Sequence, residues 1–345
     1  MANRLDMQAP SPGPRTIAGR PTFAPPRPPV LPRILLARHF PSDVVRREVE
    51  EGRWLQVRRG AYVARDGASW TGADPVERRA LHVARIAAVA AQLSAGATIS
   101  HQSAALVWGL PLWTSPRAVH VTQLHPESAL RSDDVVRHRT ALRPQDVASC
   151  SGLRVTSLSR TLTDCVTTLP PLGGLVTADA ALRSGADPDE VASILRSAAG
   201  RRGVRLGRMV AAQADGRSES PGESAVRFIL WAHGFPPPQL QVAVGTRLGV
   251  FRADLGLEEW RLLIEYDGHV KYRELAGGAP SEVLVAEKRR QDAIEEEGNK
   301  VLRVTRADLR PAQALVARVL RWVPSSAGLR LSPNAELVES LRRAL

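Results

Sequence analysis

The chain has 345 residues, of which 43% are hydrophobic, enough for two or more domains with buried cores. Lysine and arginine number 47 against 35 aspartates and glutamates, and the net charge of +12 favours a polyanionic partner, nucleic acid ahead of membrane. The two cysteines are too few for a disulfide framework or a clustered zinc site, which fits a reducing, cytoplasmic setting. No run approaches the ~20 apolar residues of a membrane span, and no signal-peptide core opens the chain, so we expect neither secretion nor membrane insertion.

Residues 1–32 are dense in proline, which removes amide donors and fixes φ so often that neither helix nor sheet can extend. We expect a disordered tail there. The pattern changes after Arg33. Ser42 is a suitable N-cap for a helix with a valine stripe, and Gly52 ends that helix.

A short hairpin that turns at Arg58, Arg59 and Gly60 follows the helix. A helix followed by an arginine-tipped hairpin is typical of a winged helix-turn-helix, in which the helix reads the groove and the wing contacts phosphate. The alternative is a small helix and hairpin with solvated arginines. The DNA-binding hypothesis assigns contacts to Arg46, Arg47, Arg58 and Arg59.

The region from residue 74 to 215 has a mixed α/β pattern without a catalytic spacing. Asp74 before Pro75 predicts the start of a helix, and strands are predicted at 117–124, 135–142 and 152–157. Further helices are predicted after the third strand.

The histidines and cysteines of this region are interpreted as structural. Ser100 and His101 suggest acid-base chemistry, but the sequence places no partner carboxylate, so a capped histidine at a helix start is preferred. The others lack metal spacing or a nucleophile motif, and the cysteines are expected to be small packing residues. They are His120, His125, His138, Cys150 and Cys165.

The C-terminal region opens with a capping box of Ser220 and Glu223. A β-hairpin is predicted from Val250 to Tyr272, with its turn at Glu258 and Glu259. A helix ended by Gly298, a buried strand and an amphipathic helix follow, so the predicted order is helix, strand, strand, helix, strand, helix.

Two acids stand near the ends of the two hairpin strands, Asp254 on the first and Glu265 on the second. A hairpin can bring both carboxylates to one side of a sheet, and paired carboxylates hold cations that prefer oxygen ligands. Glu265 ends an apolar run, where an acid is costly unless something pairs with it.

This arrangement resembles the PD-(D/E)XK nuclease fold, and in particular the endonuclease-like domains related to the very-short-patch-repair endonuclease. The resemblance spans about residues 218 to 323. It rests on the acids and on Ile264-Glu265-Tyr266-Asp267-Gly268, Lys271-Tyr272, Glu287-Lys288-Arg289-Arg290 with Asp292, and Val301-Leu302-Arg303-Val304.

The resemblance implies hydrolysis of DNA phosphodiesters with a bound Mg²⁺ or Mn²⁺ and no organic cofactor. It implies metal ligation by Asp254, Glu265 and Glu223. The catalytic set it implies is Asp254, Glu265, Asp267, Lys271 and Lys288.

One position departs from the nuclease pattern. A lysine usually stands two positions after the second acid, where this chain has Asp267. Three interpretations of Asp267 stay open. It is a third metal ligand, with Lys271 or Lys288 supplying the positive charge, or it caps the turn at Gly268. In the third, the site is a decayed nuclease that keeps only the fold.

Structural alternatives apply to other members of the set. Glu223 is equally explained as a helix cap. Lys288 and Asp292 are four apart and are explained as a solvated pair on one helix face. His269 is interpreted as an exposed turn residue.

Upstream segments resemble the AbiEi family of type IV antitoxin regulators. They are residues 33–63, Ser100-His101-Gln102-Ser103-Ala104-Ala105 to Gly109-Leu110-Pro111, and Val155-Thr156-Ser157 with Arg160-Thr161-Leu162. This resemblance implies a DNA partner and a nucleotidyltransferase-type toxin partner.

The expected fold is therefore α/β, with a winged-helix-like module, a mixed middle region and a restriction-endonuclease-like core. Three functions stay open: a metal-dependent endonuclease, an antitoxin-like regulator whose nuclease-like fold is inactive, or an accessory protein with neither activity. The expected division is a tail at 1–32, the module at 33–73, the middle region at 74–215, the nuclease-like domain at 218–323 and a tail or helix at 324–345.

Overall fold

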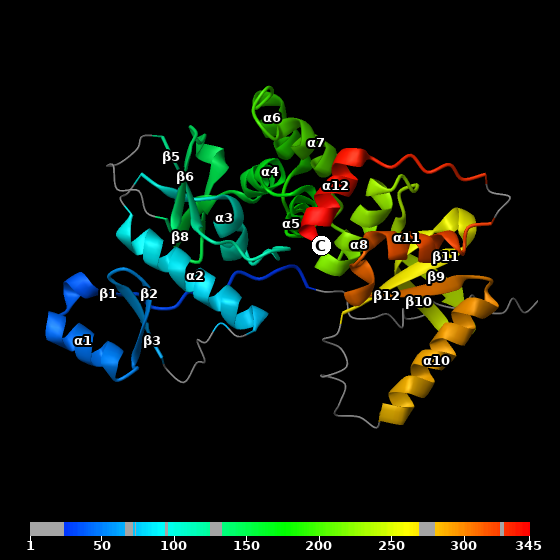
Figure 1. Ribbon diagram of the computed structural model, residues 1–345, viewed down its shortest axis with the longest axis horizontal. Coiled ribbons are helices and arrows are strands. Elements are labelled where there is room, and N and C mark those ends of the chain that lie inside the picture. Colours follow the sequence, from blue (N-terminus) through cyan, green and yellow to red (C-terminus); the bar gives the residue numbers. More distant parts are fainter. Residues whose placement is uncertain are drawn as a thin grey trace, which may run out of the picture. The chain divides into compact units, whose positions relative to one another are not determined.

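The structure is a computed structural model that describes residues 24–65, 72, 74–93, 96–124, 133–268, 280–324 and 328–345, with only the backbone for 280–284. The chain forms two compact units (Figure 1). One unit contains His233–Ser332, and the other contains Phe23–Ala232 together with Pro333–Leu345. Both units combine helices with sheets, which confirms the expected α/β class.

The larger unit begins with a small module of one sheet and two short helices. Its sheet has the order β1-β3-β2 and is antiparallel throughout. The helix and hairpin predicted from the sequence are both present, although the cap of α1 is Pro41 and the helix itself begins at Ser42. The elements are β1 (Leu35–Leu36), η1 (Ala37–His39), α1 (Ser42–Glu50), β2 (Trp54–Arg58) and β3 (Ala61–Ala64).

Helix α2 (Pro75–Gln92) connects this module to the next sheet. The Asp74 carboxylate caps it, since Oδ1 accepts from the amides of Val76 at 2.7 Å and Glu77 at 2.8 Å. Ala84 and Ala88 pack against the core of the three-stranded sheet, whereas Ile86 and Val89 pack into the core of the five-stranded sheet. Figure 1 shows α2 between the two sheets. The module is therefore packed on the middle region through α2.

The second sheet has five strands in the order β6-β5-β4-β8-β7. Three of its strands match the predicted ones, but β4, which has only two residues, and β7 were not predicted. Pairs β5–β6 and β4–β8 are parallel, and pairs β4–β5 and β7–β8 are antiparallel. The elements are β4 (Thr98–Ile99), α3 (His101–Val107), β5 (Val119–Gln123), β6 (Val135–Arg139), η2 (Pro144–Asp146), β7 (Val147–Cys150) and β8 (Leu153–Thr156).

A group of helices completes the larger unit. Helix α5 contacts α4, α7, α8 and α12, so the C-terminal helix returns to this unit. Arg227 on α8 donates to both carboxylate oxygens of Asp179 on α5 at 2.5 Å, and both side chains are buried. The helices are α4 (Leu158–Thr168), α5 (Pro171–Arg183), α6 (Pro188–Ser197), α7 (Val204–Gln213), α8 (Pro221–Ala232) and α12 (Ala335–Ala344).

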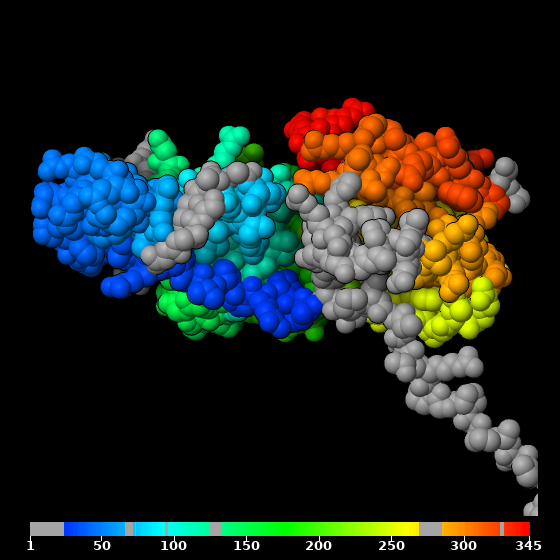
Figure 2. All heavy atoms as spheres, turned by 90° about the horizontal axis from the view of Figure 1, so that it is seen from below, coloured from blue at the N-terminus to red at the C-terminus, as the bar shows by residue number. Residues whose placement is uncertain are grey.

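Residues 24–33 form an extended segment without helix or strand, as expected from their prolines. The segment nevertheless lies against the larger unit. Ser151 Oγ donates to the Pro29 carbonyl at 3.1 Å, and the Arg27 backbone passes so close to Gly109 that it would overlap a Cβ atom there. Figure 2 shows this dark blue segment along the surface of the unit.

The smaller unit is built on a four-stranded sheet with the order β12-β11-β10-β9. The predicted hairpin is present as β10 and β11 joined by η3, but the segment before it is a further strand, β9, which the sequence interpretation did not count. Strand β12 is parallel to β11, with α10 in the crossover between them. The elements are β9 (Gln239–Thr246), β10 (Gly249–Leu257), η3 (Glu258–Trp260), β11 (Leu262–Asp267), α10 (Pro280–Glu296), β12 (Lys300–Thr305), η5 (Ala307–Leu309) and α11 (Ala312–Leu320).

Within the residues that the structure describes, no helix combines the length and apolar content that a bilayer crossing requires.

Candidate functional site

Asp254 and Glu265 lie opposite one another on the two central strands of the smaller unit. The antiparallel register pairs Leu255 with Ile264, and these acids are the next residues along β10 and β11. Asp254 is 7% exposed and Glu265 is 2% exposed. The Asp254 Oδ2 atom accepts from the Tyr266 amide at 2.7 Å, which fixes the carboxylate on the neighbouring strand. The structure therefore brings together the two acids that the sequence singled out.

Arg290 on α10 places a positive charge beside this acid pair. Its Nη2 donates to Glu265 Oε1, and its Nη1 lies 3.4 Å from Glu265 Oε2 and 3.1 Å from Glu287 Oε1. Nη2 also donates to the Arg252 carbonyl at 3.3 Å, and the guanidinium lies 5.5 Å from the ring centroid of Phe251. Burial lowers the pKa of Arg290, but attraction and hydrogen bonds from Glu265 and Glu287 outweigh it and raise the pKa overall.

Among the residues that the structure describes, Arg290 thus supplies the positive charge next to Glu265. Lys288 lies on the same helix and is exposed, as is Asp292. Lys271 lies outside the described residues. Arg290 stands in the run Glu287-Lys288-Arg289-Arg290, on which the resemblance to nucleases rests, but only the packing of α10 shows that this side chain reaches the sheet.

Asp267 ends β11, where the parallel register pairs it with Thr305 of β12. It is half-buried, as is Tyr266, whose pKa is raised mainly by burial. Gly268 does not have the positive φ seen at many of the described glycines, so the backbone there makes no left-handed turn. A position beside the acid pair, at the end of the same strand, is compatible with the metal-ligand interpretation of Asp267.

Glu223 belongs to the other compact unit, on α8. Its Oε2 accepts from the Glu219 amide at 2.8 Å, and its own amide donates to Ser220 Oγ at 3.2 Å. These are the contacts of a helix N-terminal cap. The capping interpretation accounts for Glu223, which is 3% exposed.

The predicted DNA-contacting arginines differ in their surroundings. Arg46 and Arg47 are exposed on α1, and Arg59 is exposed at the hairpin turn. Arg58, in contrast, donates to Asp134 Oδ2 through Nε at 2.6 Å and to Gln92 Oε1 through Nη1. Its side chain is 17% exposed.

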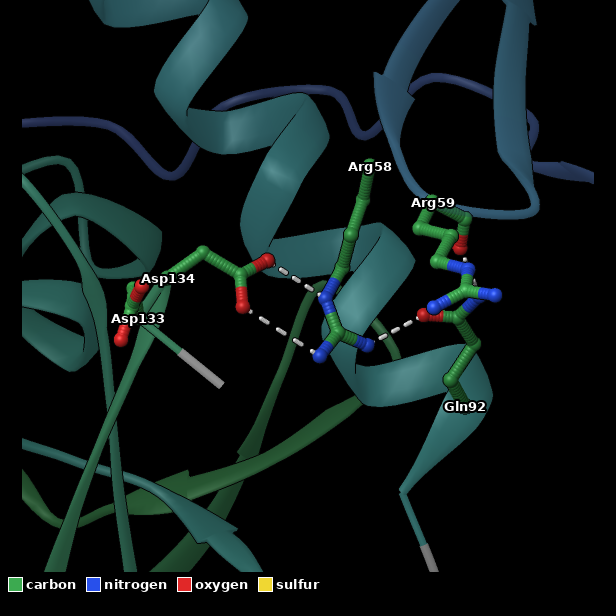
Figure 3. A pocket seen from close by; sticks show the side chains of 5 residues that line it. All are labelled: Arg58, Arg59, Gln92, Asp133 and Asp134. Carbon is green, nitrogen blue, oxygen red and sulfur yellow. Dashed lines mark hydrogen bonds and ion pairs between the residues drawn. The ribbon is translucent and has the colours of Figure 1, made fainter. Parts of the chain in front are cut away.

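Figure 3 shows the Arg58 guanidinium between Asp134 and Gln92. The Gln92 Nε2 atom also donates to the Arg59 carbonyl at 3.0 Å, so the hairpin turn is fastened to the end of α2. A hollow of about 520 Å³ is lined by Arg58, Arg59, Gln92, Asp133 and Asp134. Arg58 holds the hairpin in place, which leaves Arg46, Arg47 and Arg59 to face solvent.

Three histidines that the sequence interpretation treated as structural meet in the larger unit. One ligand atom from each of His101, His120 and His138 lies within 4.8 Å of the others. Their positions in sequence gave no metal spacing, because they come from a helix start and from two parallel strands. His125 lies outside the described residues.

The chain is similar to two uncharacterized proteins of Mycobacterium tuberculosis, from strains CDC 1551 / Oshkosh and ATCC 25618 / H37Rv. Each is 28% identical over 272 residues, which cover 77% of this chain and 94% of the relative. No family model matches the chain. The names of these two relatives state no activity.

Proposed function

We propose that the chain is a DNA-binding protein whose smaller unit hydrolyses DNA phosphodiesters at a divalent-metal site. The observation that supports this most is the pair of buried carboxylates, Asp254 and Glu265, opposed on adjacent central strands. Buried acids are costly unless a cation or hydrogen bonds compensate them. The sheet, with three antiparallel strands and a fourth parallel strand after a helix, agrees with the implied nuclease core.

The donor set suits a hard cation of the Mg²⁺ or Mn²⁺ kind, because it consists of carboxylate oxygens from Asp254, Glu265 and the nearby Asp267. Such an ion polarises a phosphoryl oxygen and lowers the pKa of an attacking water. The chain's own residues orient this set: the Tyr266 amide fixes Asp254, and Arg290 fixes Glu265. In this proposal Arg290 also provides the positive charge that a lysine provides elsewhere in the fold.

DNA binding in this proposal relies on the exposed arginines of the N-terminal module and on the net charge of +12. Arg46 and Arg47 on α1 contact phosphate or groove, and Arg59 contacts phosphate beside the fixed hairpin. A reducing, cytoplasmic setting belongs to the same proposal, and the free, buried Cys150 and Cys165 are consistent with it.

The test is a divalent-metal titration of the purified full chain with and without the Asp254 carboxylate. We expect Mg²⁺- or Mn²⁺-dependent nicking of DNA by the unmodified chain and none by Asp254→Asn. Lys288→Gln is the matched control, because Lys288 is exposed on α10 and Arg290 supplies the charge at Glu265. Absence of cleavage on duplex, single-stranded and mismatched DNA with both metals would refute the catalytic proposal.

The second candidate is an antitoxin-like regulator whose nuclease-like fold is inactive. The observation that favours it is that Arg290 already neutralises Glu265 without any metal. This candidate predicts DNA binding without cleavage and a nucleotidyltransferase-type toxin as partner. Replacing Arg46 and Arg47 by alanine should then weaken DNA binding and reduce the salt slope by about one per lost phosphate contact; an unchanged slope would count against it.

A further inference from the structure

The fold of the larger unit brings three histidines from distant segments to one place. His120 lies on β5 and His138 on β6, and the parallel register pairs His120 with Val136 and His138 with Thr122. The two histidines are therefore diagonal neighbours on one face of the sheet. His101 opens α3 directly after β4, whose antiparallel pairing with β5 lets the Ser100 amide donate to the His120 carbonyl at 3.0 Å.

The three imidazoles are in mutual contact. His120 Nδ1 lies 3.0 Å from His138 Nε2, and the His101 and His138 rings stack with centroids 3.5 Å apart. One ring nitrogen from each histidine lies within 4.8 Å of the others. Two nitrogens bound to one tetrahedral Zn²⁺ at about 2.0–2.1 Å are about 3.3 Å apart, so small rotations of the rings would bring all three to one ion.

A buried carboxylate faces the same cluster. Asp164 Oδ2 lies 3.7 Å from His101 Nδ1, and its side chain is 7% exposed. Asp164 Oδ1 accepts from Arg160 Nε at 2.8 Å, but Oδ2 has no hydrogen-bond partner among the described residues. A buried oxygen in that position is costly unless it meets a donor or a cation.

The arginines and carboxylates around the cluster add no net charge that would repel a cation. Arg160 is shared between Asp164 and Asp146, and Arg143 also pairs with Asp146. Two arginines thus face two carboxylates, so these groups cancel in charge.

From this arrangement we propose that His101, His120 and His138, with Asp164 beside them, form a binding site for a divalent metal ion such as Zn²⁺. Three imidazole nitrogens and one carboxylate are donors typical of zinc, whereas Mg²⁺ prefers oxygen ligands alone. The half-buried His120 and His138 give the ion a path from solvent. This site is independent of the acid pair in the smaller unit and of the proposed nuclease activity.

The experiment is a Zn²⁺ titration of the metal-stripped full chain by calorimetry at pH 7.5, with Co²⁺ absorption as the report on nitrogen ligands. We expect one saturable equivalent that survives Asp254→Asn and is lost in His120→Asn and His138→Asn. Asp164→Asn should weaken binding about 10–100-fold, as expected for a residue that supports the ligands. The matched control is His82→Leu, because His82 is a buried histidine outside the cluster.

A folded chain without saturable Zn²⁺ binding would overturn the proposal, and so would unchanged affinity in folded His138→Asn. If the histidine variants fail to fold, imidazole NMR of the unmodified chain decides. The proposal predicts that Zn²⁺ shifts the signals of three of the eight histidines, namely those of His101, His120 and His138. A shift confined to other histidines would refute it.

Discussion

At the scale of single residues, the partner of each buried charge decides its role. Glu265 is 2% exposed and depends on Arg290, whose side chain is 14% exposed. Removing one partner of a buried pair leaves an uncompensated charge, which typically costs about 3–5 kcal/mol. Glu265 and Arg290 are therefore coupled in folding whether or not the acid also binds a metal.

We predict that Arg290→Met lowers the free energy of unfolding by about 3–5 kcal/mol because Glu265 stays buried without its cation. The adjacent Arg289→Met is the control, since Arg289 is exposed and its loss should change stability by no more than about 0.5 kcal/mol. Urea denaturation measures both. Equal stability of the two variants would show that the pair does not contribute.

His82 gives the chain a pH-dependent contribution to stability. Burial lowers its pKa to about 4, with help from Arg85 and His120, and Nε2 has no hydrogen-bond partner among the described residues. Because the unfolded chain binds this proton near pH 6.5 and the folded chain near pH 4, stability is retained above pH 6.5 and lost as the pH falls toward 4.

Between pH 7.5 and pH 5 the unmodified chain loses free energy of unfolding. We predict that this loss is smaller by about 2 kcal/mol in His82→Leu. The difference between the two pH profiles therefore measures the contribution of His82, including its interaction with His120. His39→Asn is the control, because His39 is exposed. Parallel profiles for the unmodified chain and His82→Leu would contradict the assignment.

At the scale of elements, most of the predicted helices and strands followed from local sequence signals such as caps and turns. Asp74 caps α2 as expected, and the hairpin of β10 and β11 turns at Glu258 and Glu259. The missed strands have physical reasons. β4 has two residues and takes its pairing from β5 and β8, and β9 follows three prolines, which obscured its alternation.

The extended segment before β1 offers a test of packing at this scale. Gly109 has φ +82, and a Cβ there would overlap the Arg27 carbonyl. Gly109→Ala should therefore destabilise the unit and release residues 24–32 to proteolysis. Gly52→Ala is the matched control, because Gly52 has φ +71 with nothing within 4 Å, so it carries the left-handed strain without the overlap. Equal effects of the two substitutions would exclude a role for the segment.

At the scale of the whole molecule, the candidate sites differ in how far sequence could predict them. Asp254 and Glu265 were predicted because a hairpin fixes their register from local pattern alone. His101, His120 and His138 were not, because parallel pairing of β5 and β6 and the entry of α3 depend on long-range packing. Arg290 needed the packing of α10 on the sheet for the same reason.

The division of the chain also depends on packing. The nuclease-like domain was expected from residue 218, whereas the compact smaller unit begins at His233. Asp179 and Arg227 explain the difference, since they bind α8 to α5 in the larger unit. The proposed nuclease chemistry therefore depends on acids of the smaller unit alone, with Glu223 as a cap elsewhere.

The most direct test of the central proposal is cleavage of supercoiled DNA by the full chain in Mg²⁺ or Mn²⁺, compared with the same chain carrying Glu265→Gln. The substitution keeps the shape of the side chain but removes both the charge that would hold the ion and the charge that compensates Arg290, so the variant is compared as folded protein. The proposal predicts metal-dependent nicking that EDTA stops and that Glu265→Gln abolishes while the variant still binds DNA. Equal nicking by the two chains, or none by either under any metal, would contradict it.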